Sequence, residues 1–303
     1  MSTISFDGRV AVVTGAGGGL GRLYALELAG RGASVVVNDL GTAPDGGGVD
    51  QPDRAAAVVE EIRSSGGTAV VSNDSVTSAE GGRAIVERAI EAFGRVDVLI
   101  NNAGILRDRS FLKISAEDLD ALLDVHVRGA VFVTQAAFEH MKSAGYGRVL
   151  LTTSAAGLFG NFGQASYALA KMALVGLANV LSIEGAKYGI TCNVIAPTAS
   201  TRLTEAVFGE HAEIFAPERV VPMATYLVSE GCTETHGIFS AGGGRFAEVF
   251  VAASHGWTST GEPTAEDVRD HLPTIANQSD FFVPRDAMEE LDTLLSHIAS
   301  GRS

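Results

Sequence analysis

The chain alternates between short runs of β-branched and aliphatic residues and longer stretches with helical spacing of apolar residues. Short apolar runs bounded by glycine or polar residues are typical of buried parallel strands. The pattern predicts strands at 9–15, 33–39, 68–72, 96–100, 148–153, 190–195 and 237–240. It predicts helices at 22–31, 53–65, 79–93, 115–141, 164–187 and 217–229. This alternation favours an α/β fold, with one doubly wound parallel sheet of about seven strands and helices on both faces.

The end of the chain departs from the alternation. We expect one domain over residues 1–254 and a C-terminal helical extension over residues 255–303 that packs on the same domain. Thr264-Ala-Glu-Asp is a capping-box pattern, which predicts a helix start in this extension. Residues 41–52 are rich in Gly, Pro and Asp, which predicts a mobile loop.

The composition of the chain indicates which binding partners and which cellular compartment to expect. A chain of 303 residues that is 46% hydrophobic can bury a substantial core. A formal net charge of −14 argues against nucleic acid and anionic membrane surfaces as partners. We expect no apolar run long enough to span a bilayer, and no basic-then-apolar signal at the start. Cys192 and Cys232 lack metal-ligand spacing, so we expect no metal, reduced thiols and a cytoplasmic location.

The turn after the first predicted strand is rich in glycine. Gly15, Gly19 and Gly21 give the pattern Gly-x-x-x-Gly-x-Gly between a predicted strand and a predicted helix. Glycines in this place let the backbone approach a pyrophosphate, whose charge then lies at the N-terminus of the helix. Asp39 follows 24 positions after Gly15 and can accept the hydroxyls of an adenosine ribose while repelling a 2′-phosphate. The pattern favours NAD over NADP; the alternative is an acid that merely ends a strand.

A second group of polar residues surrounds the predicted helix 164–187. Tyr167 and Lys171 are four residues apart on this helix, so phenol and ammonium share one face. The ammonium is expected to lower the pKa of the tyrosine toward the working pH of a proton-transfer catalyst. Ser154, at the end of a predicted strand, can donate to the same substrate oxygen. The alternative is a surface Tyr–Lys pair and a loop serine without catalytic roles.

The glycine turn, the run Asn-Asn-Ala-Gly at 101–104 and the Ser, Tyr and Lys set occur in one order at coherent distances. From about residue 6 to about residue 254 the chain resembles the short-chain dehydrogenase/reductase family. The resemblance implies a Rossmann-type domain, a small-molecule substrate, NAD as cofactor, and assembly as a homodimer or homotetramer. It implies cofactor contacts from Gly15, Gly19, Leu20, Gly21, Asp39, Asp74, Ser75, Asn101, Ala103, Gly104, Tyr167, Lys171, Pro197 and Thr201.

The resemblance also implies a mechanism for oxidation of an alcohol. A hydride moves from the carbinol carbon to the nicotinamide while Tyr167, as phenolate, takes the hydroxyl proton. Ser154 holds the same oxygen, and Lys171 depresses the pKa of the tyrosine and contacts the nicotinamide ribose. Reduction of a ketone is the same path reversed.

Two positions depart from the family pattern. His126 stands where many relatives carry an asparagine that helps to hold a water near the lysine. The histidine is either a polar anchor in that role or a packed helix residue without it. Thr198 replaces the glycine that usually follows Pro197, so we expect Thr201 or Thr204 to supply the hydroxyl for the nicotinamide carboxamide.

Within the family, the runs at 36–41, 102–111 and 160–164 are similar to the dehydrogenase part of multifunctional enzymes of D-specific β-oxidation. This resemblance implies oxidation of 3R-hydroxyacyl-CoA thioesters, including CoA esters of sterol side chains. Two alternatives stay open. One is a 17β-hydroxysteroid dehydrogenase, and the other is a catalytically silent nucleotide-binding scaffold, because a fold does not fix a function.

Three further expectations concern the substrate and the assembly. Arg107 and Arg109 either meet the phosphates of CoA or pair with Asp108 and fix their own loop. Residues 205–215 are expected to form a lid over the substrate. Assembly is expected through the helices 115–141 and 164–187, because the second is apolar on nearly all sides.

Overall fold

The computed structural model describes residues 3–48, 50–201, 209 and 212–300. The chain divides into two compact units, Met1–Glu248 and Val249–Ser303. The structure therefore divides the chain six residues earlier than the boundary we expected at residue 254. The expectation that the C-terminal extension packs on the first unit stays a prediction.

The first unit is built on one sheet with the strand order β3-β2-β1-β4-β5-β6-β7-β8. The pairs from β3 to β7 are parallel. The order reverses between β1 and β4, and open parallel sheets bind ligands at the carboxyl ends of strands beside such a point. The strands are β1 (Val10–Thr14), β2 (Ser34–Asn38), β3 (Thr68–Ser72), β4 (Val98–Asn101), β5 (Gly147–Thr152), β6 (Ile190–Thr198), β7 (Ile238–Gly242) and β8 (Arg245–Val249).

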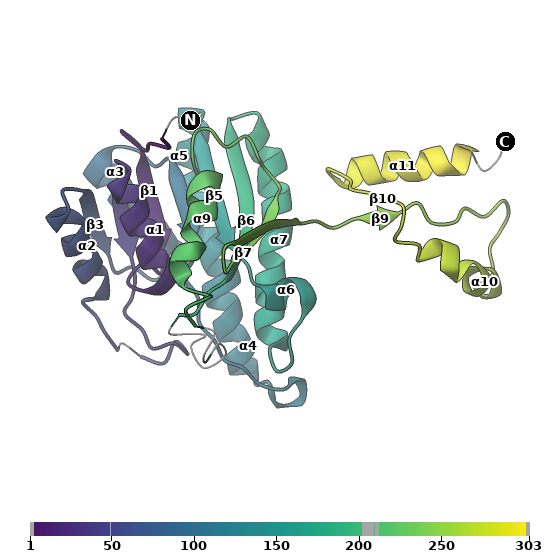
Figure 1. Cartoon of the computed structure of the whole chain (residues 1–303), viewed down its shortest axis with the longest axis horizontal. Helices are drawn as coiled ribbons and strands as arrows, with labels where there is room; N and C mark the ends of the chain where they lie inside the picture. The colour runs from purple at the N-terminus through teal and green to yellow at the C-terminus, as the bar shows by residue number, and fades with distance from the viewer. Residues whose placement is uncertain (1–2, 49, 202–208, 210–211, 301–303) are drawn as a thin grey trace. The chain divides into compact units, whose positions relative to one another are not determined.

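Helices cover both faces of this sheet (Figure 1). One layer consists of α1 (Gly19–Gly30), α2 (Arg54–Ser64) and α9 (Val221–Leu227), with both α2 and α9 in contact with α1. The other layer consists of α3 (Ala79–Phe93), α5 (Gly129–Ala144) and α7 (Ala165–Ala186), with α5 in contact with the other two. The predicted α/β fold with a doubly wound parallel sheet is confirmed.

The structure corrects two details of the predicted elements. An eighth strand, β8, follows β7 through the turn Gly243-Gly244, whose φ angles are +60° and +83°. The single helix expected over 115–141 is instead α4 (Ala116–Leu122), a π-helical segment η2 (Leu123–Arg128) and α5. Ser115 caps α4 by accepting from the Asp118 N–H, as the capping pattern predicts.

The helix α7 corrects the expectation that no apolar run is long enough to span a bilayer. By length and composition this helix passes that test, with a mean hydropathy of 1.5. The same test is passed by core helices of globular domains, and α7 packs on β5 and β6 in the sheet core. The absence of membrane insertion stays a prediction.

The second unit carries α10 (Ala265–Ile275), α11 (Ala287–Ser300) and the antiparallel pair β9 (Ala253–Ser254) and β10 (Phe281–Phe282). The predicted capping box at the start of α10 is present, because Thr264 and Asp267 exchange side-chain and backbone hydrogen bonds. The indole of Trp257 stacks on the ring of His271 at a centroid distance of 4.0 Å. These contacts fold the extension into a unit of its own.

Candidate active site

A cavity of about 560 Å³ opens where β1, β2 and β4 end. Its lining combines the glycine turn after β1, the start of the 41–52 loop, the segment after β3 and the segment after β4. Nine predicted cofactor-binding residues line this one cavity: Gly15, Gly19, Leu20, Asp39, Asp74, Ser75, Ala103, Gly104 and Thr201. The reversal of strand order therefore gathers residues that are far apart in the sequence.

The glycine turn lies directly against the segment after β4. A Cβ atom on Gly15 would lie 2.7 Å from the Ala103 Cα, and Gly15 has a φ of +63°. A Cβ atom on Gly21 would lie 2.2 Å from the carbonyl oxygen of Gly15. The Thr14 hydroxyl accepts from the backbone N–H groups of Asn102 and Ala103, both at 3.1 Å. These approaches leave room for no side chain, which explains the glycines physically.

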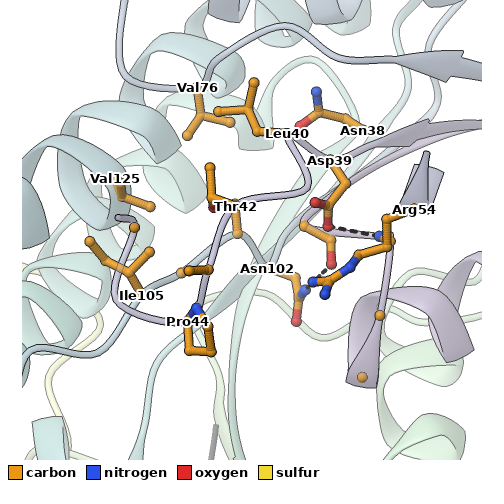
Figure 2. A pocket seen from close by; sticks show the side chains of 18 of the residues that line it. Asn38, Asp39, Leu40, Thr42, Pro44, Arg54, Val76, Asn102, Ile105 and Val125 are labelled. Atoms are coloured by element: carbon orange, nitrogen blue, oxygen red, sulfur yellow. Dashed lines mark hydrogen bonds between the residues drawn. The ribbon is translucent and has the colours of Figure 1, made fainter. Parts of the chain in front are cut away.

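Asp39 has a defined orientation in the cavity. Its carboxylate accepts from the backbone N–H groups of Gly17 at 2.9 Å and Gly41 at 2.7 Å. A carboxylate has about four acceptor sites, so acceptors remain for the hydroxyls of a ribose. Figure 2 shows Asp39 on one side of the cavity and the apolar Ile105 and Val125 on the opposite side.

These observations fit a dinucleotide. A cradle of backbone without side chains suits a pyrophosphate, and a fixed carboxylate suits a ribose diol. Leu40 and Val76 supply apolar surface for a base (Figure 2). The chemistry of the lining therefore matches the cofactor that the glycine pattern predicted.

Five predicted cofactor residues lie outside the lining of this cavity: Gly21, Asn101, Pro197, and the pair Tyr167 and Lys171 described below. Gly21 packs against the glycine turn, and Pro197 lies in β6 opposite Ala241 of β7. The Asn101 amide donates to the Thr134 hydroxyl at 2.8 Å, which ties β4 to α5. Their contact with a cofactor stays a prediction.

Ser154, Tyr167 and Lys171 come together where β5 ends and α7 begins. Ser154 caps α6 (Ala155–Phe159) by accepting from the Ala156 N–H, and it shares a hydrogen bond with the Tyr167 phenol. Lys171 is buried and its Nζ donates to the Thr152 carbonyl at 2.7 Å. The Lys171 Nζ lies 5.6 Å from the centroid of the Tyr167 ring. The predicted catalytic residues are therefore neighbours in space.

The structure overturns the predicted effect of Lys171 on the pKa of the tyrosine. Burial raises the pKa of Tyr167 to about 12, and the hydrogen bond with Ser154 opposes that rise. Burial lowers the pKa of Lys171 to about 7. The expected fall in the tyrosine pKa is wrong, because burial disfavours the charged form of both groups.

His126 lies in the π-helical segment η2 and is buried. Its Nε2 lies 2.9 Å from the carbonyl oxygen of Ile105 and 3.2 Å from the Ile105 N–H nitrogen. Its ring meets that of Tyr167 edge-on at a centroid distance of 5.5 Å. Burial and the charge of Lys171 hold the pKa of His126 well below its usual value, so the imidazole is neutral.

These contacts support the interpretation of His126 as a packed histidine, and its role as a polar anchor for a water near the lysine stays a prediction. It is a packed histidine whose Nε2 anchors the backbone after β4, and it also contacts the catalytic tyrosine. Its Nδ1 faces no hydrogen-bond partner among the described residues. A buried cavity of about 10 Å³ lies between His126, Thr152 and Lys171, which is about the space that one water needs.

Arg107 and Arg109 are paired, but not through the side chain of Asp108. Both guanidinium groups lie near the Asp118 carboxylate, at 3.5 Å for Arg107 and 3.8 Å for Arg109. The Asp108 carboxylate instead accepts from the Gln164 amide at 2.8 Å. The run 107–109 therefore fixes the loop and ties it to the start of α7, which favours the second of the two interpretations.

Large apolar side chains are exposed on the two segments joined by this contact. Phe111 and Leu112, just after the arginines, are 77% and 95% exposed. Phe159 and Phe162, just before Gln164, are 71% and 92% exposed. The predicted lid at 205–215 and the candidate Thr204 fall mostly or wholly outside the described residues.

The comparisons with known proteins agree with this geometry. The family model described as short chain dehydrogenase matches residues 9–210. The chain belongs to the short-chain dehydrogenase family, and it is an oxidoreductase that acts on CH–OH groups. A short-chain type dehydrogenase/reductase of Mycobacterium tuberculosis is 49% identical over 89% of this chain and 95% of that protein.

Longer relatives share the same segment. The peroxisomal multifunctional enzyme type 2 of Mus musculus is 48% identical over 95% of this chain, and the peroxisomal multifunctional enzyme A of Dictyostelium discoideum is 46% identical over 98%. The chain spans 39% of the mouse enzyme and 66% of the Dictyostelium enzyme.

Among solved structures, full-length peroxisomal multifunctional enzyme type 2 from Drosophila melanogaster superposes with a TM-score of 0.82 and 38% identity. That match covers 98% of this chain and 50% of the other chain. A 7α-hydroxysteroid dehydrogenase, solved with NADH and 7-oxo glycochenodeoxycholic acid, superposes with a TM-score of 0.71 and 29% identity. It covers 79% of this chain and 95% of the other.

Sequence reasoning missed several residues of the site. Thr14 and Asn102 join the glycine turn after β1 to the segment after β4. Their positions next to Gly15 and Ala103 in the sequence could have indicated this role. Arg54 lines the cavity from the first turn of α2, and Asp118 neutralises the arginines of the loop. The sequence held no signal for these last two, because loop conformation alone brings them into place.

Proposed function

We propose that this chain catalyses NAD-dependent interconversion of a 3R-hydroxyacyl-CoA thioester and the 3-ketoacyl-CoA. The observation that carries the chemistry is the hydrogen-bonded pair of Ser154 and Tyr167 beside a buried Lys171. This group lies at the carboxyl edge of the sheet, as does a cavity suited to a dinucleotide.

The side chains divide the work. A bound nicotinamide would supply the hydride acceptor or donor. Ser154 holds the reacting oxygen, and Tyr167 exchanges a proton with it. Because the pKa of Tyr167 is raised to about 12, its phenol is protonated at neutral pH and can donate its proton to a ketone oxygen. Oxidation of the alcohol needs the phenolate, which the Ser154 hydrogen bond favours.

The acyl-CoA substrate is supported by the relatives and by the surface beside the catalytic group. Two multifunctional enzymes and a Saccharomyces cerevisiae hydratase-dehydrogenase-epimerase, 49% identical over 86% of this chain, share the segment. A Mycobacterium tuberculosis protein named a hydroxyacyl-CoA dehydrogenase is 36% identical. The exposed Phe111, Leu112, Phe159 and Phe162 suit an apolar acyl chain.

A hydroxysteroid is the second candidate substrate, supported by the likeness to the 7α-hydroxysteroid dehydrogenase. The same apolar surface suits a sterol ring, and a CoA ester of a sterol side chain would combine both chemistries. A catalytically silent scaffold has less support, because Ser154, Tyr167 and Lys171 are all present and adjacent. We further propose a homo-oligomer and a cytoplasmic location.

The test is a panel of hydroxyacyl-CoAs and hydroxysteroids, each with NAD or NADP, followed by reduced-cofactor absorbance. We expect the acyl-CoA with NAD to give the largest kcat/KM. Turnover of free hydroxysteroids alone would favour the second candidate. Turnover of neither, by protein that binds NAD, would favour the scaffold.

A further inference from the structure

The charged residues of the dinucleotide cavity are two acids and one base. Among the described residues that line it, Asp39 and Asp74 are acidic and Arg54 is basic. Arg54 is the first residue of α2 and follows the 41–52 loop, so it lies outside the glycine turn. Figure 2 shows Arg54 on the same side of the cavity as Asp39.

Arg54 and Asp39 meet over one glycine. A Cβ atom on Gly17 would lie 2.7 Å from both Cγ and Cδ of Arg54 and 2.8 Å from Cγ of Asp39. The aliphatic stem of the arginine therefore lies across the glycine turn, next to the carboxylate that is expected to face the ribose. Only a residue without a side chain at position 17 permits this arrangement.

The guanidinium of Arg54 is held in place but keeps donors to spare. Its Nε and Nη2 donate to the Gln51 Oε1 at 3.1 Å and 2.8 Å. A guanidinium has five N–H donors, so donors remain after these two bonds. The ion pairs found among the described residues do not include Arg54.

We propose that Arg54 contacts the adenosine end of the cofactor and, together with Asp39, sets the choice between NAD and NADP. Asp39 repels a 2′-phosphate, and Arg54 is the cation that a 2′-phosphate requires. The inference rests on the proposed dinucleotide function and names the residue that governs its cofactor specificity.

The opposite charges of Asp39 and Arg54 predict how a substitution of either residue changes the preference between NAD and NADP. In the parent the carboxylate is fixed by two backbone N–H groups, so its repulsion of a dianionic phosphate dominates and NAD is preferred. Removal of that carboxylate leaves a guanidinium already positioned for the fork-shaped hydrogen bonding that phosphates accept. One substitution at Asp39 therefore opens the site to NADP without any added basic residue.

Calorimetric binding tests the proposal without relying on turnover. The probes are NAD, NADP, 5′-AMP and adenosine 2′,5′-bisphosphate, titrated into the parent, Asp39→Ala, Arg54→Ala and the double variant. We expect Asp39→Ala to improve binding of the bisphosphate relative to 5′-AMP by about tenfold or more, as a charge-assisted contact allows. We expect the double variant to lose that gain in bisphosphate binding. We expect Arg54→Ala alone to weaken the binding of NAD several-fold.

Two controls separate this role from a structural one. Arg83→Ala removes an exposed arginine of α3 that does not line the cavity, and it should leave all four affinities unchanged. Gln51→Ala removes the partner that holds the guanidinium, and it should reduce the binding affinities less than Arg54→Ala does. Melting temperatures of all variants check that each is folded.

Several results would overturn the proposal. Equal bisphosphate binding by Asp39→Ala and the double variant would show that Arg54 does not contact the phosphate. A Gln51→Ala variant that reproduces every effect of Arg54→Ala would make the arginine a loop tether only. Failure of the proposed function is distinguishable, because the parent would then bind 5′-AMP and NAD normally yet oxidise no alcohol.

Discussion

At the residue scale, burial dominates the acid–base chemistry of the catalytic group. Tyr167 and Lys171 share a helix face as their spacing predicted, yet the pKa of the phenol is raised and that of the ammonium is lowered. Spacing on a helix is readable from sequence, whereas desolvation depends on what packs around the pair. The Lys171 ammonium donates to the Thr152 carbonyl at 2.7 Å.

The first prediction concerns the ionisation of Tyr167 in the cofactor-free protein. The pKa of about 12 means that the phenol keeps its proton at neutral pH. We expect the tyrosinate difference absorbance between the parent and Tyr167→Phe to show no ionisation below about pH 10, the usual tyrosine value. A midpoint near neutral pH would contradict the raised pKa. It would instead support a lowering of the tyrosine pKa by the Lys171 ammonium, as the spacing of the two residues suggested.

The second prediction concerns the stability cost of Lys171. Burial lowers the pKa of Lys171 from its ordinary value of 10.5 to about 7, so the folded chain binds fewer protons than the unfolded chain between those values. Stability therefore rises with pH across this window, and the cost of the buried amine is greatest at its lower end. Lys171→Met should abolish turnover. At pH 7 it should also melt at a higher temperature than the parent, because its free energy of unfolding should be greater by on the order of 1–3 kcal/mol.

The pH series supplies the check on that substitution. The gain in melting temperature of Lys171→Met over the parent should shrink as the pH is raised from 7 toward 10. A gain that is constant with pH would show that the effect is packing and not desolvation. Lys171→Arg keeps the charge and should show no such gain.

At the element scale, the sequence predicted where strands and helices lie better than how one helix is wound. The apolar runs and their glycine turns locate β1 to β7, because a buried parallel strand needs little else. The π-helical segment η2 has no such signal, since its residues would suit an ordinary helix equally well. Its wider turn places His126 against the catalytic tyrosine, and π-bulges are frequent at functional sites.

The third prediction concerns Gly104, which faces this segment. A Cβ atom on Gly104 would lie 2.5 Å from the Cε1 of His126. Gly104→Ala should displace the imidazole, destabilise the fold by on the order of 1–3 kcal/mol as overpacking does, and reduce kcat at least tenfold. Denaturant unfolding and steady-state kinetics measure both effects.

A matched control is Gly94→Ala, at a glycine with no atoms near the added Cβ but a φ of +79°. That variant should lose stability from backbone strain while kcat stays near the parent value. If Gly104→Ala behaved in the same way, the contact with His126 would have no part in catalysis.

At the scale of the whole molecule, the reversal of strand order assembles the cavity from segments far apart in sequence. The glycine turn and Asp39 were predictable, because their chemistry is carried by local patterns beside strands. Arg54 and Asp118 were not, because each reaches the site through the path of a loop. The correction at Arg107 and Arg109 has the same origin, since their pairing with Asp118 depends on where α4 begins.

The fourth prediction concerns assembly through α7. Leu169, Met172, Val180 and Ile183 are exposed along this helix at spacings of a single helix face. An apolar stripe of this kind favours a second copy of the chain as its cover. We expect light scattering at micromolar concentration to give a dimer or tetramer, and Ile183→Glu to shift it toward the monomer.

Glu184→Gln changes the adjacent exposed residue of the same helix and should leave the assembly intact. A monomeric mass for the parent would contradict the proposed homo-oligomer. So would an Ile183→Glu variant that is folded and keeps the parent mass.

The most direct test of the account as a whole is one reaction followed in two variants. The parent and Tyr167→Phe are each incubated with a 3R-hydroxyacyl-CoA and NAD, with NADH read by absorbance and the acyl product by mass spectrometry. We expect equal amounts of NADH and 3-ketoacyl-CoA from the parent. We expect turnover to fall about a thousandfold or more in Tyr167→Phe, with NAD affinity nearly unchanged, because the phenol moves the proton. Turnover by Tyr167→Phe within a few-fold of the parent, or no ketoacyl product from a parent that binds NAD, would contradict these expectations.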